Sequence, residues 1–393
     1  MRSRTSSLVG LRLALILLAG LPAAARATDY TWNAGGDRTN WFDPNNWSPA
    51  GGPVNAGDGA ILNTGGPVLL TNSTPVLASV VVSGVTLTFS NWPTALQATN
   101  VILQPGSILN HSACDTNALS SNTNRVLIVC SNLTALGSIT VDALGYRGAV
   151  NAAVWGQGPG AARDESGGSY GGSGRQPPAA STGPIYGSTN APIDPGSGGG
   201  GRAAGEQGGH GGGAVCINAS GHVLVNGTIS ANGADKNNNA GGGSGGSVYI
   251  ACRTFASTNG TLRAKGGTSG QTTGHTGWGG GGGRIALVYD AAAQSNLTAS
   301  AAPTPDIYAG GGWALNRSGR PGTLFFTDAG FYPSADLTLK GGELVIPGFS
   351  TWAPGSITVN GGVVIFPAGL QIQVTNPVSI GRNRGGIETT KAD

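Results

Sequence analysis

The sequence predicts an all-β protein built as a parallel β-helix, a solenoid in which each coil packs only against its neighbours. Three observations point to this class. Short runs of valine, isoleucine and leucine alternate with small polar residues between turn signals along most of the chain. The central third repeats itself at intervals typical of solenoids. After residue 28 no stretch combines helical apolar spacing with capping residues, and DAAAQSNLTASAA is the only candidate for a short helix.

Residues 1–27 are predicted to be a secretory signal peptide. Early arginines precede the apolar stretch LALILLAGLPAA, and Ala25-Arg26-Ala27 forms a small-x-small cleavage signal. We expect cleavage between Ala27 and Thr28 and an exported chain that is secreted or held at the cell surface. The apolar stretch is short for a membrane anchor and no later segment is apolar enough to cross, so no transmembrane helix is expected after cleavage.

Residues 28–66 are predicted to form an N-terminal cap. Trp32, Trp41 and Trp47 lie here among Asn, Gly and Asp, and large aromatic side chains can cover the open end of a first coil. The alternative is an aromatic platform that contacts sugar rings, with nearby carboxylates as hydrogen-bond acceptors or calcium ligands. Those carboxylates belong to Asp37, Asp43 and Asp58.

Residues 67–144 alternate apolar and small residues between turns, so we expect the first β-helix coils there. Residues 145–202 are rich in glycine and proline. They are too long for a plain connection and too poor in apolar residues to form their own core. We therefore expect a long surface loop that leaves the solenoid and lies across it, and such loops often carry function.

Residues 203–328 are predicted to form glycine-rich repeat coils, each with a glycine run, a strand, a turn and a second strand. The last glycine before each strand is Gly213, Gly246, Gly283 or Gly322, which gives steps of 33, 37 and 39 residues. Period-two alternation then places one apolar ladder inside the solenoid. Its expected members are Val126, Ile128, Val215, Ile217, Val248, Ile250, Ile285, Leu287, Leu324 and Phe326. Residues 329–393 are expected to add C-terminal coils and a tail.

The glycine run from Gly241 to Gly246 satisfies the G-x-G-x-x-G pattern, but a nucleotide site is not predicted. In such a site a strand precedes the glycines and a helix follows them. Here the strand-like run SVYIAC follows. The glycines instead allow close backbone packing or turns with positive φ. The histidines and cysteines lack metal-ligand spacing, so neither a metal nor another cofactor is expected.

Four cysteines remain after cleavage, and their pairing is open because three disulfide arrangements are possible. Cys130 and Cys252 lie on the inward side of their strands, so we expect buried thiols there. The alternation places the Cys216 side chain on the outward side of its strand. The pairing of Cys114 is equally open.

The charge balance excludes two classes of partner. The chain carries 21 Lys and Arg residues against 18 Asp and Glu residues, and removal of the four signal-peptide arginines leaves 17 against 18. Charged residues make up 10% of the chain and form no basic cluster. Neither nucleic acid nor an anionic membrane surface is therefore an expected partner.

Several motifs resemble a known group of proteins. The segments WNAGGDRTNWFDPNNW, GGSYGGSG, GGGSGGSVYIAC and GGGGGRIALVYD are similar to those of glycine-rich, autotransporter-like β-helix proteins that planctomycete and verrucomicrobial bacteria export. The resemblance extends over nearly the whole mature chain. It implies a right-handed parallel β-helix at the surface or outside the cell, but it carries no catalytic residues across.

The expected function is structural or adhesive, through many weak contacts with glycans or neighbouring proteins. The alternative is a polysaccharide lyase or glycoside hydrolase on a pectin-lyase-like β-helix, because that architecture hosts such enzymes. An enzyme would need acidic and basic side chains to converge. The candidates are Asp164, Glu165 and Arg175 in the long loop, with Asp142 near a strand end.

Overall fold

The computed structural model describes residues 27–114, 124–150, 155–177, 181–202, 205–236, 239–269, 271–272, 275–297, 304–306, 317–332, 337–339, 341–360, 362–380 and 386–389. The predicted signal peptide, apart from Ala27, lies outside these residues. The fold is nearly all-β with mostly parallel sheets, which confirms the predicted class at that level. Within the described residues the helices are a short α1 (Ala291–Gln294) and one 3-10 turn (Pro44–Asn46).

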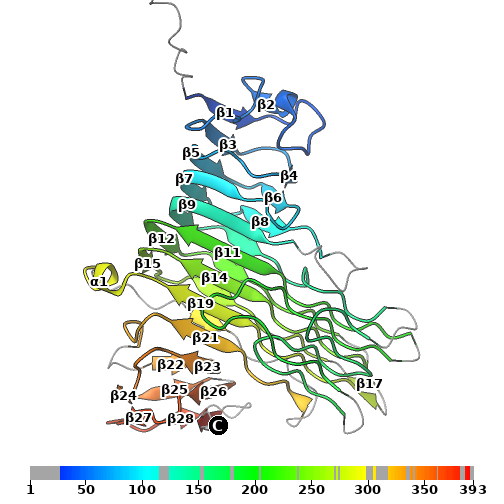
Figure 1. The fold of residues 1–393 in the computed structure, drawn as a ribbon, viewed down its shortest axis with the longest axis vertical. Coiled ribbons are helices and arrows are strands. Elements are labelled where there is room, and N and C mark those ends of the chain that lie inside the picture. The colour runs from blue at the N-terminus through cyan, green and yellow to red at the C-terminus, as the bar shows by residue number, and fades with distance from the viewer. Residues whose placement is uncertain are drawn as a thin grey trace, which may run out of the picture.

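The largest sheet runs along the long axis of the molecule (Figure 1). Its strands in spatial order are β2 (Trp47–Ser48), β1 (Asp29–Trp32), β3 (Gly59–Leu62), β5 (Leu77–Val82), β7 (Leu96–Leu103), β9 (Val126–Ala135), β11 (Ala214–Ala219), β14 (Ser247–Ala251), β19 (Arg284–Val288), β21 (Thr323–Phe326), β23 (Gly342–Val345), β26 (Val363–Phe366) and β29 (Gly386–Thr389). Two further strands extend it, because β12 (His222–Val225) pairs with β9 and with β15 (Thr254–Ala256).

A second, seven-stranded sheet takes the intervening strands. They are β4 (Val68–Leu70), β6 (Thr86–Phe89), β8 (Ile108–His111), β10 (Ser138–Thr140), β13 (Thr228–Ser230), β16 (Thr261–Arg263) and β20 (Thr304–Asp306). From β3 to β11 the chain alternates between the two sheets at every strand. Each strand therefore pairs in parallel with a strand from the following repeat.

Three small sheets complete the fold. The first contains β22 (Leu337–Leu339), β25 (Ile357–Val359) and β28 (Ser379–Ile380), and the second pairs β24 (Thr351–Trp352) with β27 (Gln371–Ile372). The third is an antiparallel pair, β17 (Gln271–Thr272) and β18 (His275–Thr276). Apart from it and β1–β2, the strand pairs of the described residues are parallel.

The predicted apolar ladder is confirmed in register. Val215 pairs with Val126 and Val248, and the pairing continues from Val248 to Ile285 and on to Leu324. The second row of the ladder pairs in the same way, as Ile128, Ile217, Ile250, Leu287 and Phe326. All ten side chains are buried, as the period-two alternation predicted.

The predicted short helix is also present. Asp290 caps α1, since its side chain accepts a hydrogen bond from the Ala293 amide at 3.0 Å. Gln294 then ties the helix to β15, accepting from the Phe255 amide at 2.7 Å and donating to the Phe255 carbonyl at 2.9 Å.

The cysteines are all free thiols. Cys130 belongs to the core and Cys252 packs against it half-buried, in agreement with their predicted inward direction. Cys114 and Cys216 are buried as well. Burial raises the pKa of Cys130 and of Cys252 to about 12.

The segment 145–202 differs from the expected surface loop. Its glycine-rich stretches are buried and bond through their backbones to the glycine runs that precede the repeat strands. Together they form a compact unit beside the sheets, here called the glycine bundle (Figure 1). Its segments are 145–149, 156–160, 166–172, 196–201, 208–213, 231–235, 241–246, 264–267 and 277–283.

The run 241–246 illustrates how the bundle is held together. Gly241 and Ser244 donate to carbonyls of the segment 196–201. Gly242 and Gly245 donate to the segment 277–283, and the remaining two residues donate to the segment 231–235. Partners thus recur at every third residue and point to three different neighbours. This threefold period, without strand pairing, is typical of a polyproline II conformation.

Glycine is required in the bundle for space. A Cβ atom on Gly246 would collide with the backbone carbonyls of Gly212 and Gly213, and one on Gly211 would collide with that of Gly196. Neither Gly246 nor Gly211 has a positive φ, although Gly158 in the segment 156–160 does, with φ of 97°. Of the two roles that the sequence suggested for glycine, close backbone packing and turns with positive φ, close packing applies to Gly246 and Gly211. The expectation of a surface loop for residues 145–202 was based on their small number of apolar side chains. The core of the bundle instead consists mainly of hydrogen-bonded backbone.

Candidate functional site

The three N-terminal tryptophans lie in the core. Trp32, Trp41 and Trp47 are at most 1% exposed, and Trp47 packs edge-on against both others at centroid distances of 5.1 and 4.9 Å. The Trp47 indole N–H donates to the Trp41 carbonyl at 2.7 Å. Because no ring face is open to a sugar, the arrangement favours a cap over an aromatic platform.

The aspartates around these tryptophans bind the backbone of their own loops. Asp58 accepts from the Thr28 and Asn55 amides at 3.1 and 2.9 Å. Asp43 accepts from the Asp37 and Asn45 amides at 2.8 and 3.0 Å. Their oxygen atoms therefore stabilise the cap. Within the part of the chain that the structure describes, no group of three His, Cys, Asp or Glu side chains could hold a metal ion.

The acidic and basic candidates from the sequence have separate partners. Asp164 pairs with Arg163 at 2.8 Å, and Glu165 pairs with Arg202 at 3.2 Å. The main chain of Arg175 belongs to the bundle, because its carbonyl accepts from Gly167 and its amide donates to Gly279.

The fourth candidate, Asp142, is also engaged in a local contact. Its two carboxylate oxygens accept from the backbone and side-chain N–H groups of Asn232, at 2.7 and 3.1 Å. The side chain thereby links β10 to the segment that follows β13. Asp142, Asp164 and Glu165 thus contact three different residues.

The separation of Asp164 and Glu165 has a backbone cause. Both adopt left-handed conformations, with φ of 49° and 68°. Such conformations are unfavourable for non-glycine residues and occur in tight turns. The turn closes with a hydrogen bond from the Ser166 amide to the Arg163 carbonyl at 3.0 Å. The two neighbouring carboxylates consequently contact different arginines.

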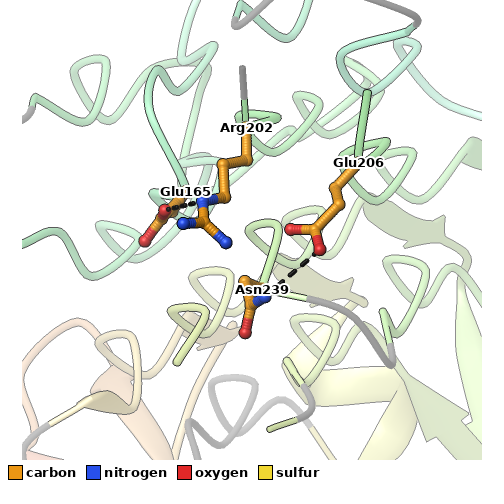
Figure 2. Close-up of polar contacts among 4 residues, drawn as sticks. All are labelled: Glu165, Arg202, Glu206 and Asn239. Carbon is orange, nitrogen blue, oxygen red and sulfur yellow. Dashed lines mark hydrogen bonds and ion pairs between the residues drawn. The ribbon is translucent and has the colours of Figure 1, made fainter. Parts of the chain in front are cut away.

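These arginines belong to a cluster of longer polar side chains, here called the distal tip. It consists of Trp155, Arg163, Asp164, Glu165, Arg202, Glu206 and Asn239. Each lies in sequence between segments of the glycine bundle. Figure 2 shows four of them, with the Arg202 guanidinium between the carboxylates of Glu165 and Glu206.

Backbone and side-chain contacts hold the distal tip together. The Arg202 amide donates to the Glu206 carbonyl at 3.2 Å, and the Asn239 side-chain amide donates to Glu206 Oε1 at 3.2 Å. Glu206 Oε2 is buried without a hydrogen-bond partner. On the other side, the Arg163 guanidinium lies 4.9 Å from the centre of the Trp155 ring, and the two residues form an antiparallel bridge.

Trp155, Arg202, Glu206 and Asn239 were not identified from the sequence. Arg202 and Asn239 lie 47 and 84 residues after Trp155, and only the folding of the bundle brings them near Arg163 and Glu165. One feature of the sequence could have indicated this cluster. Charged and aromatic residues interrupt the glycine-rich segments at a few points, and these points meet at the distal tip.

A buried polar network joins the bundle to the large sheet. The Tyr170 hydroxyl hydrogen-bonds to Ser247 Oγ at 2.6 Å, and Ser247 Oγ donates to the Asp194 carbonyl at 2.5 Å. Arg284 donates to the Tyr186 carbonyl at 3.0 Å. Burial raises the pKa of the Tyr170 hydroxyl, so it stays protonated near neutral pH. The network thus fixes the bundle on β14 and β19.

His111 provides a second junction. Its Nδ1 lies 2.7 Å from the Ser112 carbonyl, and its Nε2 accepts from the Ala214 amide at 3.2 Å. The ring also packs on Gly213, where a Cβ atom would collide with it. Burial lowers the pKa of His111 to about 4, so the ring is neutral at pH 7. Both ring nitrogens are engaged, so this histidine has a structural role.

Comparison with protein-family models, with curated proteins and with solved structures found no match to this chain. No helix of the described part of the chain is long and apolar enough to cross a membrane. Arguments about function therefore depend on the geometry of the bundle and its distal tip.

Proposed function

We propose that this chain is a secreted or cell-surface scaffold with a structural or adhesive function. In this proposal a right-handed parallel β-helix carries the glycine bundle as a rigid projection, and the distal tip contacts glycans or neighbouring proteins. The motifs that resemble exported glycine-rich β-helix proteins support the same assignment.

The strand order supports the β-helix. Successive strands alternate between two sheets, and each strand pairs in parallel with its counterpart in the next repeat. The connection from one strand to its parallel neighbour in the same sheet is right-handed in nearly all proteins.

The observation that carries the functional proposal is the contrast between the bundle and its end. The bundle interior is mostly glycine backbone and small residues, and the hydroxyl of its buried Tyr170 is engaged with Ser247. The distal tip places an aromatic ring, arginines and carboxylates together. A densely hydrogen-bonded support with recognition groups at one end is suited to presenting a contact surface.

The polysaccharide-degrading alternative lacks a comparable observation. Glycoside hydrolases place two carboxylates about 5 to 10 Å apart across the scissile bond. The carboxylates of Asp142, Asp164 and Glu165 each have a structural partner. We therefore favour binding over catalysis.

A binding experiment with clustered protein tests the proposal. The chain without residues 1–27 is biotinylated and applied, as a monomer and as a streptavidin tetramer, to immobilised polysaccharides and to bacterial cell envelopes. Many weak contacts predict that the tetramer binds at least tenfold more tightly than the monomer. Absence of binding to every surface, or sustained release of reducing ends from a polysaccharide, would contradict it.

A further inference from the structure

We propose that the distal tip is a binding site for a neutral polysaccharide, with Trp155 as the stacking platform and Asp164 and Arg163 as the polar contacts. This inference rests on the adhesive function proposed above and specifies its ligand. It is carried by the exposure of one tryptophan, by the side chains that orient it, and by the charge balance of the tip.

Trp155 differs from the other described tryptophans in exposure. It is 53% exposed, whereas Trp278 is 9% exposed and Trp92 is half-buried. An exposed indole offers an accessible aromatic face, and such a face can stack on the apolar side of a sugar ring. Arg163 lies over the ring at 4.9 Å from its centre, and about half of the Trp155 surface stays exposed beside it.

Arg163 and Asp164 add hydrogen-bonding groups beside this ring. Arg163 stacks on Trp155 and pairs with Asp164 at 2.8 Å, which restrains all three side chains. Both charged side chains are nearly half exposed, 47% for Arg163 and 44% for Asp164. A sugar hydroxyl both donates and accepts hydrogen bonds, so it fits a carboxylate and a guanidinium that lie side by side.

Glu206 adds a carboxylate at the other side of the tip. Its Oε1 accepts from Asn239, but its Oε2 is buried and has no donor. A buried acceptor without a partner is unfavourable. In Figure 2 the Arg202 guanidinium pairs with Glu165, and the Glu206 carboxylate contacts Asn239 instead. Because this oxygen is buried, Glu206 contributes to the choice of ligand through its charge and not through a direct contact.

The charges favour a neutral ligand over an acidic one. Arg163 is paired with Asp164, and Arg202 with Glu165. Glu206 adds a third carboxylate to these two arginines. Among these five side chains an anionic polysaccharide such as polygalacturonate would meet two arginines that are already near carboxylates, and one carboxylate more than there are arginines. Hydroxyl groups on a neutral chain meet no such repulsion.

Affinity electrophoresis tests this inference with defined probes. The chain without residues 1–27 is run in native gels containing laminarin, xyloglucan or glucomannan, and in gels with polygalacturonate or alginate. We expect retardation by at least one neutral polysaccharide and by neither acidic one. Trp155→Ala is expected to weaken the affinity at least tenfold, and Asp164→Asn at least threefold.

Trp92→Ala is the matched control. Trp92 also stacks with an arginine, since Arg125 lies 4.4 Å from its ring centre, but it is remote in sequence from the tip. This variant should keep wild-type affinity. Because Trp155 is exposed, Trp155→Ala should also keep the wild-type melting temperature, which separates lost binding from lost folding.

The outcomes separate the two proposals. Binding to a neutral polysaccharide that both tip variants leave unchanged would overturn the tip assignment while the adhesive function stands. Binding to the acidic polysaccharides alone would overturn the ligand class. Binding only to an envelope protein, lost in Trp155→Ala, would make the tip a protein contact and overturn the polysaccharide assignment. Absence of binding to any surface would overturn both proposals.

Discussion

Substitution of Gly246 by alanine should strongly destabilise the protein, although alanine usually stabilises a chain by restricting its unfolded state. The Gly246 amide donates to the Ala231 carbonyl at 2.7 Å, and the next amide, of Ser247, donates to the Gly213 carbonyl at 3.1 Å. A Cβ atom on Gly246 would collide with the Gly212 and Gly213 carbonyls. Because these are backbone atoms, they cannot move aside without disturbing the hydrogen bonds.

The magnitude follows from three contributions. Overpacking of a tight site costs about 1–3 kcal/mol. Weakening of two buried hydrogen bonds costs about 1 kcal/mol each. Alanine also lowers the conformational entropy of the unfolded chain, which stabilises the folded protein by about 0.4–1 kcal/mol. We therefore expect Gly246→Ala to lower the free energy of unfolding by about 2–4 kcal/mol.

Urea unfolding followed by tryptophan fluorescence measures this change. Gly386→Ala is the matched control, because a Cβ atom on Gly386 would make only an ordinary contact of 3.8 Å with Val363 Cγ2. The control should be as stable as the wild type or more stable by up to about 1 kcal/mol. Equal stability of Gly246→Ala and wild type would refute the close packing deduced for the bundle.

Two further predictions concern buried ionisable groups. Because burial lowers the pKa of His111 from 6.5 to about 4, the unfolded state binds the extra proton between these values, so stability should fall as the pH drops from 6.5 to 4. The loss approaches about 3 kcal/mol, and urea unfolding at pH 7 and pH 4.5 should show a smaller difference in His111→Gln than in wild type. The thiols of Cys130 and Cys252, with pKa values of about 12, should react with Ellman's reagent at pH 8 far more slowly in the folded protein than in urea. Rapid labelling of the folded protein, or unequal total thiol counts with and without reductant, would contradict the free and buried cysteines.

The strands of the repeats could be predicted because their side chains carry a pattern. Alternation of apolar residues identified the inward row from Val126 to Leu324, and the repeat spacing fixed its register. Alignment of the repeats also predicted the second strand of each repeat, such as β13 and β16. The stretch DAAAQSNLTASAA was the only candidate for a short helix, and the structure shows α1 there with Asp290 as its N-cap.

The glycine bundle could not be predicted in this way. Its neighbours recognise one another through backbone N–H and C=O groups, which every residue has, so the sequence contains no complementary side chains to align. Pairing of residues as distant as Gly168 and Gly242 becomes visible only in three dimensions. The distal tip depends on the bundle, and its convergence was hidden for the same reason.

Amide hydrogen exchange tests most directly the central claim, that the glycine-rich segments form a rigid, hydrogen-bonded support. All six amides of the run 241–246 donate to backbone carbonyls of the bundle. The account predicts that they exchange as slowly as the amides of β14 (Ser247–Ala251), the strand that follows them. Exchange of the run within seconds at neutral pH, while β14 remains protected, would show a flexible loop and contradict the account.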